Sequence, residues 1–170
     1  MIRISDNEID GLIRGMAVDT RAWLDRTGRG NPLIIGVHTG GLWVAERLRR
    51  ELAIGSPVGE LNIAFYRDDF SRIGMHPRVT PSHLPLAVDD QHLILVDDVL
   101  NTGRTIRAAM NEIFDWGRPA SVCLAVLIER GGRELPVQAD VIGRRLDLRP
   151  DEHVKLSGPE PLALEIKKSE

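Results

Sequence analysis

The apolar residues near the N-terminus recur at the spacing of an amphipathic helix. Ser5 and Glu8 fit a capping box, in which a serine and a glutamate three residues later satisfy backbone N–H groups at a helix start. Gly28 falls where the periodic pattern stops, as a glycine after a helix end does. The sequence therefore predicts a helix that begins after the capping box and ends near residues 27–30. Its shared apolar face comprises Ile9, Leu12, Ile13, Met16, Trp23 and Leu24.

Short apolar runs further along the chain predict strands. Residues 33–37, 93–96 and 122–128 form nearly continuous apolar runs, which are typical of strands buried on both faces of a sheet. Residues 61–66 alternate between apolar and polar positions, which indicates a strand with one buried face.

Helical patterns separate these strands. One directs Ala45 and Leu48 inward, and another carries apolar positions at helical spacing from Ile106 to Phe114 before residues 117–119 end it. Strands that alternate with helices in this way predict an α/β fold, an open and mostly parallel sheet flanked by helices.

Two stretches depart from this alternation. Residues 67–88 contain several prolines and charges and no regular pattern, and a loop of that length in a compact domain is usually functional or mobile. We expect it to be flexible. After residue 130, short strands are expected at 139–142, 154–156 and 162–166, separated by glycine and proline. They predict a small C-terminal hood, approximately residues 130–166, on a single domain of residues 1–170.

Length, composition and charge narrow the class of protein. The 170 residues match one domain at about 150 residues per domain and fall short of a TIM barrel, which usually needs about 250. Apolar residues make up 42% and charged residues 28%, which excludes a disordered or fibrous chain. A net charge of -3 excludes a molecule that is basic throughout, although a local basic patch stays open.

The single cysteine and the hydropathy of the chain bear on its compartment. Cys123 lies in an apolar run and has no second cysteine to pair with, so we expect a buried core thiol in a reducing environment. The sequence contains neither an apolar stretch of membrane-spanning length nor an N-terminal signal-peptide pattern. We therefore expect a cytoplasmic protein that does not contact membranes.

Residues 93–105 carry the strongest chemical signal. An apolar strand leads into Asp97 and Asp98, and a Thr-Gly-Arg-Thr turn at 102–105 then opens a helix. Ligands of open α/β sheets bind at the carboxyl ends of strands, and the free N–H groups of a helix start bind anions. Gly103 allows close backbone approach, so a phosphate fits the turn, while the carboxylates suit hydroxyl groups or a hydrated cation. Together they describe a site for a ribose 5-phosphate.

Other roles for Asp97 and Asp98 explain fewer of the residues in the segment 93–105. The chain lacks the P-loop and the Gly-x-Gly-x-x-Gly dinucleotide motif. A receiver-type acidic pocket could use Asp97 and Asp98 but would not need the turn that follows. As plain cap and loop residues, the two aspartates would leave the rest of the string without a role.

The string resembles the PRPP-binding signature of type I phosphoribosyltransferases: four apolar residues, two acids, two apolar residues and a variable residue before Thr-Gly-(Arg/Lys)-Thr. Further segments resemble one family in particular, the bifunctional pyrimidine-operon regulators and uracil phosphoribosyltransferases (PyrR). These segments are residues 36–41, 65–69, 117–119 and 129–136. The resemblance extends roughly over residues 30–145 and implies the type I phosphoribosyltransferase fold.

The resemblance implies a reaction and a PRPP site. Uracil and PRPP would give UMP and pyrophosphate, with Mg²⁺ as cofactor. Asp97 and Asp98 would be catalytic: they would hold the ribose hydroxyls, face the metal through PRPP and water, and stabilise a cation-like sugar electrostatically. The implied PRPP-binding residues are Val96, Asp97, Asp98, Val99, Leu100, Asn101, Thr102, Gly103, Arg104 and Thr105, of which residues 101–105 hold the 5-phosphate.

The remaining parts of the implied site lie on three other segments. Arg67 would be catalytic and begins the loop that closes over PRPP to exclude water. Uracil would lie against residues 130–142. The pyrophosphate loop is implied at Thr39, Gly40 and Gly41, and the base-binding residues at Val137, Asp140 and Ile142.

Two positions depart from the family pattern. Gly40 stands where the pyrophosphate loop is expected to carry arginine, and a charged hydrogen bond is worth about 1.5–3 kcal/mol. Asn101 stands where purine-specific relatives carry an acidic base, which argues against transfer to a purine. Uracil is acidic enough at N1 that the reaction does not require a strong base.

Two kinds of function therefore remain open. The first is a uracil phosphoribosyltransferase, a regulator of a pyrimidine-biosynthesis operon, or both. The alternative is a catalytically weak or inactive regulator that senses PRPP or UMP for an RNA or protein partner. Residues 16–21 of the first helix are not strongly basic, so an RNA hairpin would have to contact a patch of Arg133, Arg144 and Arg145. The resemblance also implies a homo-oligomer, a dimer or larger.

Overall fold

A computed structural model describes residues 2–63 and 82–169 of the chain. The first long element is helix α1 (Asp6–Thr27), and it forms as predicted. The hydroxyl and backbone N–H groups of Ser5 donate to Glu8 at 2.8 and 2.9 Å, and these bonds lower the pKa of the Glu8 carboxyl. Gly28 ends the helix with a left-handed φ of 66°, which a residue with a side chain rarely adopts.

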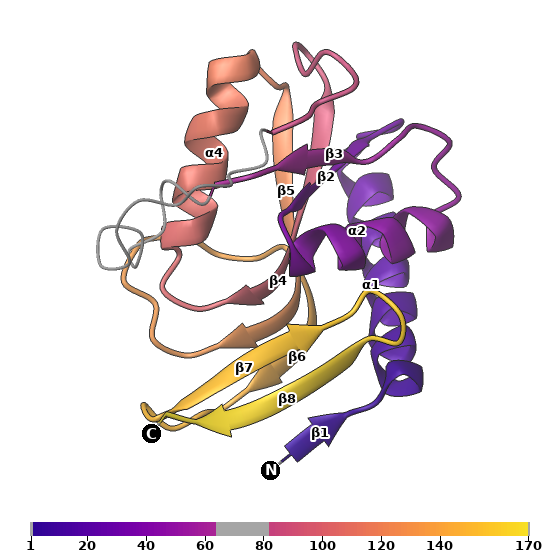
Figure 1. Cartoon of the computed structure of the whole chain (residues 1–170). Helices are drawn as coiled ribbons and strands as arrows, with labels where there is room; N and C mark the ends of the chain where they lie inside the picture. The colour runs from indigo at the N-terminus through magenta and orange to yellow at the C-terminus, as the bar shows by residue number, and fades with distance from the viewer. Residues whose placement is uncertain (1, 64–81, 170) are drawn as a thin grey trace.

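The main sheet has five parallel strands in the order β3-β2-β4-β5-β6 (Figure 1). The predicted open, parallel α/β sheet is thus confirmed. Its strands are β2 (Leu33–Val37), β3 (Gly59–Leu61), β4 (His92–Leu100), β5 (Ser121–Arg130) and β6 (Val141–Leu146). Helix α2 (Gly40–Glu51) follows β2, and helix α4 (Arg104–Trp116) follows β4.

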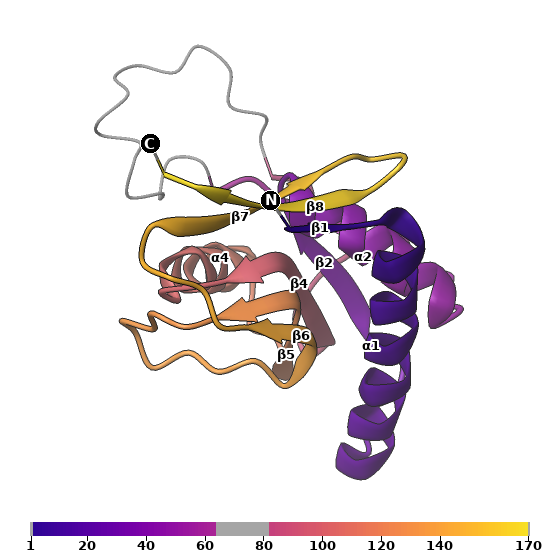
Figure 2. The ribbon, with the colours of Figure 1, turned by 90° about the horizontal axis from the view of Figure 1, so that it is seen from below.

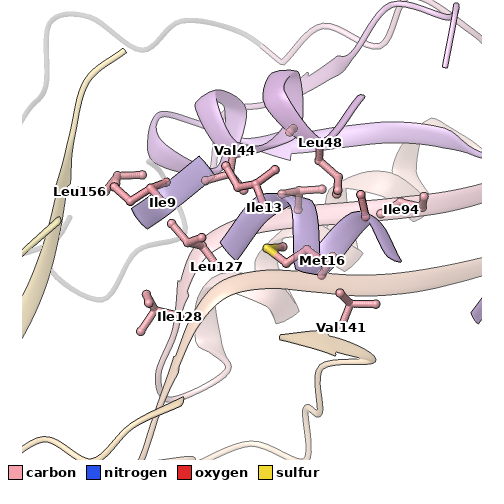
Figure 3. Packing of buried hydrophobic residues seen from close by; sticks show 14 of the residues in the cluster. Ile9, Ile13, Met16, Val44, Leu48, Ile94, Leu127, Ile128, Val141 and Leu156 are labelled. Atoms are coloured by element: carbon pink, nitrogen blue, oxygen red, sulfur yellow. The ribbon is translucent and has the colours of Figure 1, made fainter. Parts of the chain in front are cut away.

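Helices cover both faces of this sheet. On one face, α1 and α2 pack into a large apolar cluster, in which Figure 3 shows Ile13 and Met16 of α1 close to Leu48 of α2. On the other face, Ile106 and Ile113 of α4 pack against buried residues of β4 and β5. Burial on both faces explains why these strands read as nearly continuous apolar runs. Cys123 lies inside the first cluster, where burial raises the pKa of its thiol to about 12.

A second, antiparallel sheet has the order β1-β8-β7. It joins the N-terminal strand β1 (Ile2–Ile4) to the C-terminal strands β7 (Glu152–Ser157) and β8 (Ala163–Lys168). Figures 1 and 2 show it beside the start of α1, with both chain ends near it. Its buried residues, such as Leu156 and Leu164, belong to the same core cluster as Ile9 of α1, so the two sheets share one core.

Some sequence expectations differ from the observed elements. The strand expected at 139–142 forms as β6 and joins the main sheet, and residues 2–4 form a strand that the pattern did not suggest. Of the expected strand at 61–66, residues 64–66 lie outside the described residues, as do residues 67–81 of the expected loop. In the described ranges, no helix combines the length and the apolar character needed to cross a membrane.

Arg47 connects α2 to the start of α1. Its side chain is 13% exposed, and its guanidinium contacts Asp6 at 2.9 Å and Asp10 at 2.7 Å. Burial alone would lower the pKa of Arg47, but its hydrogen bonds to these carboxylates raise it. Asp6 also accepts the backbone N–H of Leu162 at 2.6 Å, so the cluster fixes the turn before β8 as well.

We predict that Arg47→Met lowers the free energy of unfolding by about 1–3 kcal/mol, because it removes two charged hydrogen bonds from a half-buried cluster. Urea denaturation followed by circular dichroism measures the loss. Arg50→Met is the matched control: Arg50 is exposed on the same helix, so its replacement should change stability by less than about 0.5 kcal/mol. Equal losses in the two variants would contradict a stabilising role for these ion pairs.

Candidate active site

The two aspartates of the predicted site lie near the carboxyl end of β4. Asp97 is 3% exposed and Asp98 is half-buried. The N–H of Asp98 donates to Oδ1 of Asp97 at 2.9 Å, and the N–H of Val99 donates to Oδ1 of Asp98 at 2.9 Å. Each carboxylate is therefore held in orientation by the backbone of the next residue. A buried carboxylate at a strand end is costly unless it is hydrogen-bonded in this way, which makes these side chains candidates for a function.

The glycine turn of residues 39–41 lies directly against this acidic pair, because β2 and β4 are neighbours in the sheet. A Cβ atom placed on Gly40 would lie 2.2 Å from Oδ2 of Asp98, and one on Gly41 would lie 2.7 Å from the carbonyl oxygen of Val96. At Gly41 the obstacle is backbone, so only glycine allows this approach, and at Gly40 a side chain would have to displace the Asp98 carboxylate. The peptide bond between His38 and Thr39 is cis, and the Thr39 hydroxyl lies 2.9 Å from Nδ1 of His38.

The predicted phosphate-binding turn begins α4. Gly103, at a φ of 95°, precedes the helix, and the N–H of Arg104 donates to Oγ1 of Thr102 at 3.2 Å. The first turn of α4 contains no acidic residue. The helix therefore places no negative charge of its own at the positive end of its dipole, and the turn suits an anion.

Two of the residues before this turn face the core. Val96 and Leu100 are 0% and 1% exposed, so neither offers a side chain to a ligand. Asn101 and Arg104 are exposed, and Nε of Arg104 contacts Glu134 at 2.9 Å.

The segment of residues 131–140 lies over the turn. The N–H groups of Glu134 and Leu135 both donate to the carbonyl oxygen of Thr102, at 2.9 and 3.0 Å. A Cβ atom on Gly103 would lie 3.2 Å from the side chain of Val137, so Val137 closes against the turn. This contact places one predicted base-binding residue beside the predicted phosphate site.

The other two predicted base-binding residues lie at the start of β6, where Asp140 is exposed and Ile142 is half-buried. Asp140 joins β5: its carboxylate accepts the N–H of Leu124 at 2.9 Å, and its own N–H donates to the carbonyl of Leu124 at 2.8 Å. Ile142 is paired with Val126, which in turn is paired with Asp97. Contact of either residue with a base stays a prediction.

The arginines of the predicted RNA patch differ in direction. Arg144 and Arg145 are exposed, and Nε of Arg145 contacts Glu129 at 2.8 Å. Arg133 is only 26% exposed and donates to Glu129, Val137 and Asn101. Glu129 was not among the site residues predicted from the sequence, although it lies only four residues before Arg133.

Arg67, the predicted catalytic residue of the loop, lies outside the described residues.

The described residues contain no group of three or more histidine, cysteine, aspartate or glutamate side chains that could hold a metal ion. Asp97 and Asp98 alone supply two carboxylates. Mg²⁺ keeps several waters and binds through one or two carboxylates together with substrate phosphates. The pair therefore fits a cation that arrives with a phosphorylated substrate, and it does not fit a cation held by protein ligands alone.

Comparisons with known proteins identify the family to which this chain belongs. The family described as phosphoribosyl transferase domain matches residues 12–156. A Nitrosococcus oceani protein named "Bifunctional protein PyrR" is 61% identical over 160 residues, which cover 93% of this chain and 90% of the relative. A Pseudomonas aeruginosa protein of the same name is 58% identical over 156 residues, which cover 92% of each chain.

Solved structures agree on the fold. Hypoxanthine phosphoribosyltransferase from Trypanosoma cruzi superposes with a TM-score of 0.68 at 21% identity, over 98% of this chain and 95% of that one. A hypoxanthine-guanine-xanthine phosphoribosyltransferase gives 0.59 at 20% identity, over 84% and 76%. These identities support the fold alone, and they confirm the type I phosphoribosyltransferase architecture. With a matched domain and relatives that share more than half of its residues, the chain belongs to the type I phosphoribosyltransferases of the PyrR family.

Proposed function

We propose that this phosphoribosyltransferase transfers the phosphoribosyl group of PRPP to uracil, forming UMP and pyrophosphate, and that it regulates a pyrimidine-biosynthesis operon. One observation carries the catalytic part: Asp97 and Asp98 lie between a glycine turn on one side and a helix-start anion site on the other. The membership in the PyrR family supports both parts.

The three pieces of the site match the three parts of PRPP. The 5-phosphate binds at residues 101–105, where the α4 start offers N–H groups and the first helical turn carries no acidic side chain of its own. The ribose hydroxyls donate to Asp97 and Asp98. The pyrophosphate then lies toward the turn of residues 39–41, which contacts the same carboxylates. Uracil enters from the side of Val137, beside Gly103.

The chain's residues act on the transfer mainly through electrostatics. N1 of uracil forms a bond to C1 of the ribose while the C1–O bond to pyrophosphate breaks, the pyrophosphate keeps that electron pair, and the N1 proton passes to pyrophosphate or water. The ribose carries positive charge in between, and the oriented carboxylates of Asp97 and Asp98 stabilise it. Mg²⁺, when it is bound with PRPP, neutralises charge on the leaving pyrophosphate. No described side chain needs to act as a strong base.

Gly40 has a packing role that bears on activity. A side chain at this position would overlap the carboxylate of Asp98, so glycine here permits the contact between the turn and the acidic pair. The absence of arginine is therefore no reason to assign the protein an inactive, sensing role. The N–H groups of the turn remain as partners for pyrophosphate.

RNA binding in this proposal depends on Arg144 and Arg145, which are exposed on β6. Exposed arginines supply the electrostatic contacts to phosphates that dominate RNA affinity. As successive residues of a strand, these two point to opposite faces of β6, so each would contact RNA from its own side. Self-association as a homo-oligomer is also part of the proposal, as the family resemblance implies. The proposed substrates PRPP and UMP are highly charged and do not cross membranes, so we place the protein in the cytoplasm.

The first experiment is an assay of labelled uracil with purified protein, PRPP and Mg²⁺, with guanine and orotate as competing bases. We expect PRPP-dependent formation of UMP, and we expect guanine and orotate to compete poorly. Absence of product with uracil, or preferred use of another base, would contradict the proposed specificity.

The acidic pair provides the sharpest test of the site. We predict that Asp97→Asn combined with Asp98→Asn lowers kcat/KM by at least about a hundredfold, because charges that stabilise the transition state are worth about 10²–10³ in rate. Asp115→Asn, an exposed aspartate at the other end of α4, is the matched control and should keep its activity. Activity near the starting value in the folded double variant would contradict this site.

Gly40→Ala tests the packing of the turn. We predict a tenfold or larger loss of kcat/KM, because the added Cβ displaces the Asp98 carboxylate, and a charged hydrogen bond of about 1.5–3 kcal/mol corresponds to that factor. Gly15→Ala is the matched control: Gly15 is exposed in α1 with open space around it, and alanine should stabilise that helix slightly. An unchanged rate in Gly40→Ala would show that the turn tolerates a side chain.

A further inference from the structure

Arg133 joins three segments that meet at the proposed site. All three nitrogens of its guanidinium donate to protein acceptors. Nη1 donates to the carbonyl of Asn101, Nε to the carbonyl of Val137 at 2.8 Å, and Nη2 to Oε1 of Glu129 at 2.8 Å. Arginine suits this task because its planar group holds several donors in a fixed arrangement.

The two carbonyl acceptors belong to different halves of the site. Asn101 begins the turn that we assign to the 5-phosphate, and Val137 belongs to the segment that we assign to uracil. The backbone bonds from Glu134 and Leu135 to Thr102 connect the same two stretches. The guanidinium is thus a bridge between the phosphate turn and the base segment, close to both and outside the sheet.

Glu129 fixes the position of the bridge. Its carboxylate, 16% exposed, accepts from Arg133 through Oε1 and from Arg145 through Oε2, both at 2.8 Å. It extends from the carboxyl end of β5, beside Leu100 of β4 in the register of the sheet. The bridge is therefore anchored to the strand next to the one that carries the acidic pair.

We propose that Arg133 is a positioning residue that couples the phosphate turn to the base segment, so that a ligand that binds both halves gains affinity from their alignment. The inference rests on the proposed function for the identity of the two halves. It also takes Arg133 out of the RNA patch, because all of its nitrogens are directed at protein acceptors and its side chain is largely covered.

The test compares a ligand that contacts both halves with one that contacts only the phosphate half. UMP and ribose 5-phosphate are titrated by calorimetry into the full-length protein, its Arg133→Met and Arg133→Lys variants, and the control Arg118→Met, an exposed arginine at the opposite end of α4. We expect Arg133→Met to weaken UMP binding about ten- to a hundredfold, the factor that a lost charged hydrogen bond gives. Ribose 5-phosphate binding should weaken several times less.

Arg133→Lys should recover part of the loss, because an ammonium group can still bind one or two of the acceptors. Arg118→Met should bind both ligands normally. In the kinetic assay, Arg133→Met should raise the KM values of uracil and PRPP together and lower kcat less. If Arg133→Met does not fold, Arg133→Lys provides the same ligand comparison with a smaller expected difference.

Two results would overturn the inference. Equal weakening of both ligands would indicate a general structural role, and unchanged ligand binding with weaker binding of an RNA hairpin would return Arg133 to a nucleic-acid surface. Failure of the proposed function gives a different result: the unaltered protein would then form no UMP from uracil, while the titrations would still report on the bridge. A protein that binds neither ligand would overturn both.

Discussion

The site depends on one close approach, that of the glycine turn of residues 39–41 to the acidic pair at the end of β4. Parallel pairing of β2 with β4 brings the two carboxyl ends to the same edge of the sheet. The absence of side chains at Gly40 and Gly41 then lets the backbone of the turn meet Asp98 and the carbonyl of Val96. The phosphate turn follows from the same strand, so its place is fixed once β4 is placed.

This contact changes how a sequence difference is interpreted. In the sequence, Gly40 is a missing arginine, and a missing charge suggests weaker binding of pyrophosphate. In the structure, the space that a side chain would need at Gly40 contains the Asp98 carboxylate. The same residue therefore permits the observed position of the Asp98 carboxylate, which a side chain at Gly40 would displace. The effect of replacing a residue of the family pattern therefore depends on the atoms that surround that position in the fold.

The sequence predicts the parts of this fold that depend on local chemistry. The capping box of Ser5 and Glu8, the strands buried on both faces, and the strand–turn–helix around Gly103 all appear where their patterns place them. Pairings between distant residues are not visible in the same way. β1 has only three residues, and its pairing with β8 joins the two ends of the chain. β6 looked like part of the hood because nothing local shows that it pairs with β5.

The partners of charged residues are also not visible in the sequence. Arg133 and Arg145 are equivalent in the sequence as basic residues near the predicted base segment, and both contact Glu129 at 2.8 Å. Their surroundings separate them: the Arg145 side chain is 75% exposed, whereas that of Arg133 is 26% exposed and directs its other donors at two backbone carbonyls. An arginine that is largely exposed keeps donors available to an anionic partner, whereas one whose nitrogens all donate to protein acceptors has fewer left for a partner. Of the predicted RNA patch, Arg144 and Arg145 are thus exposed on β6, whereas Arg133 is directed at acceptors of Asn101, Glu129 and Val137.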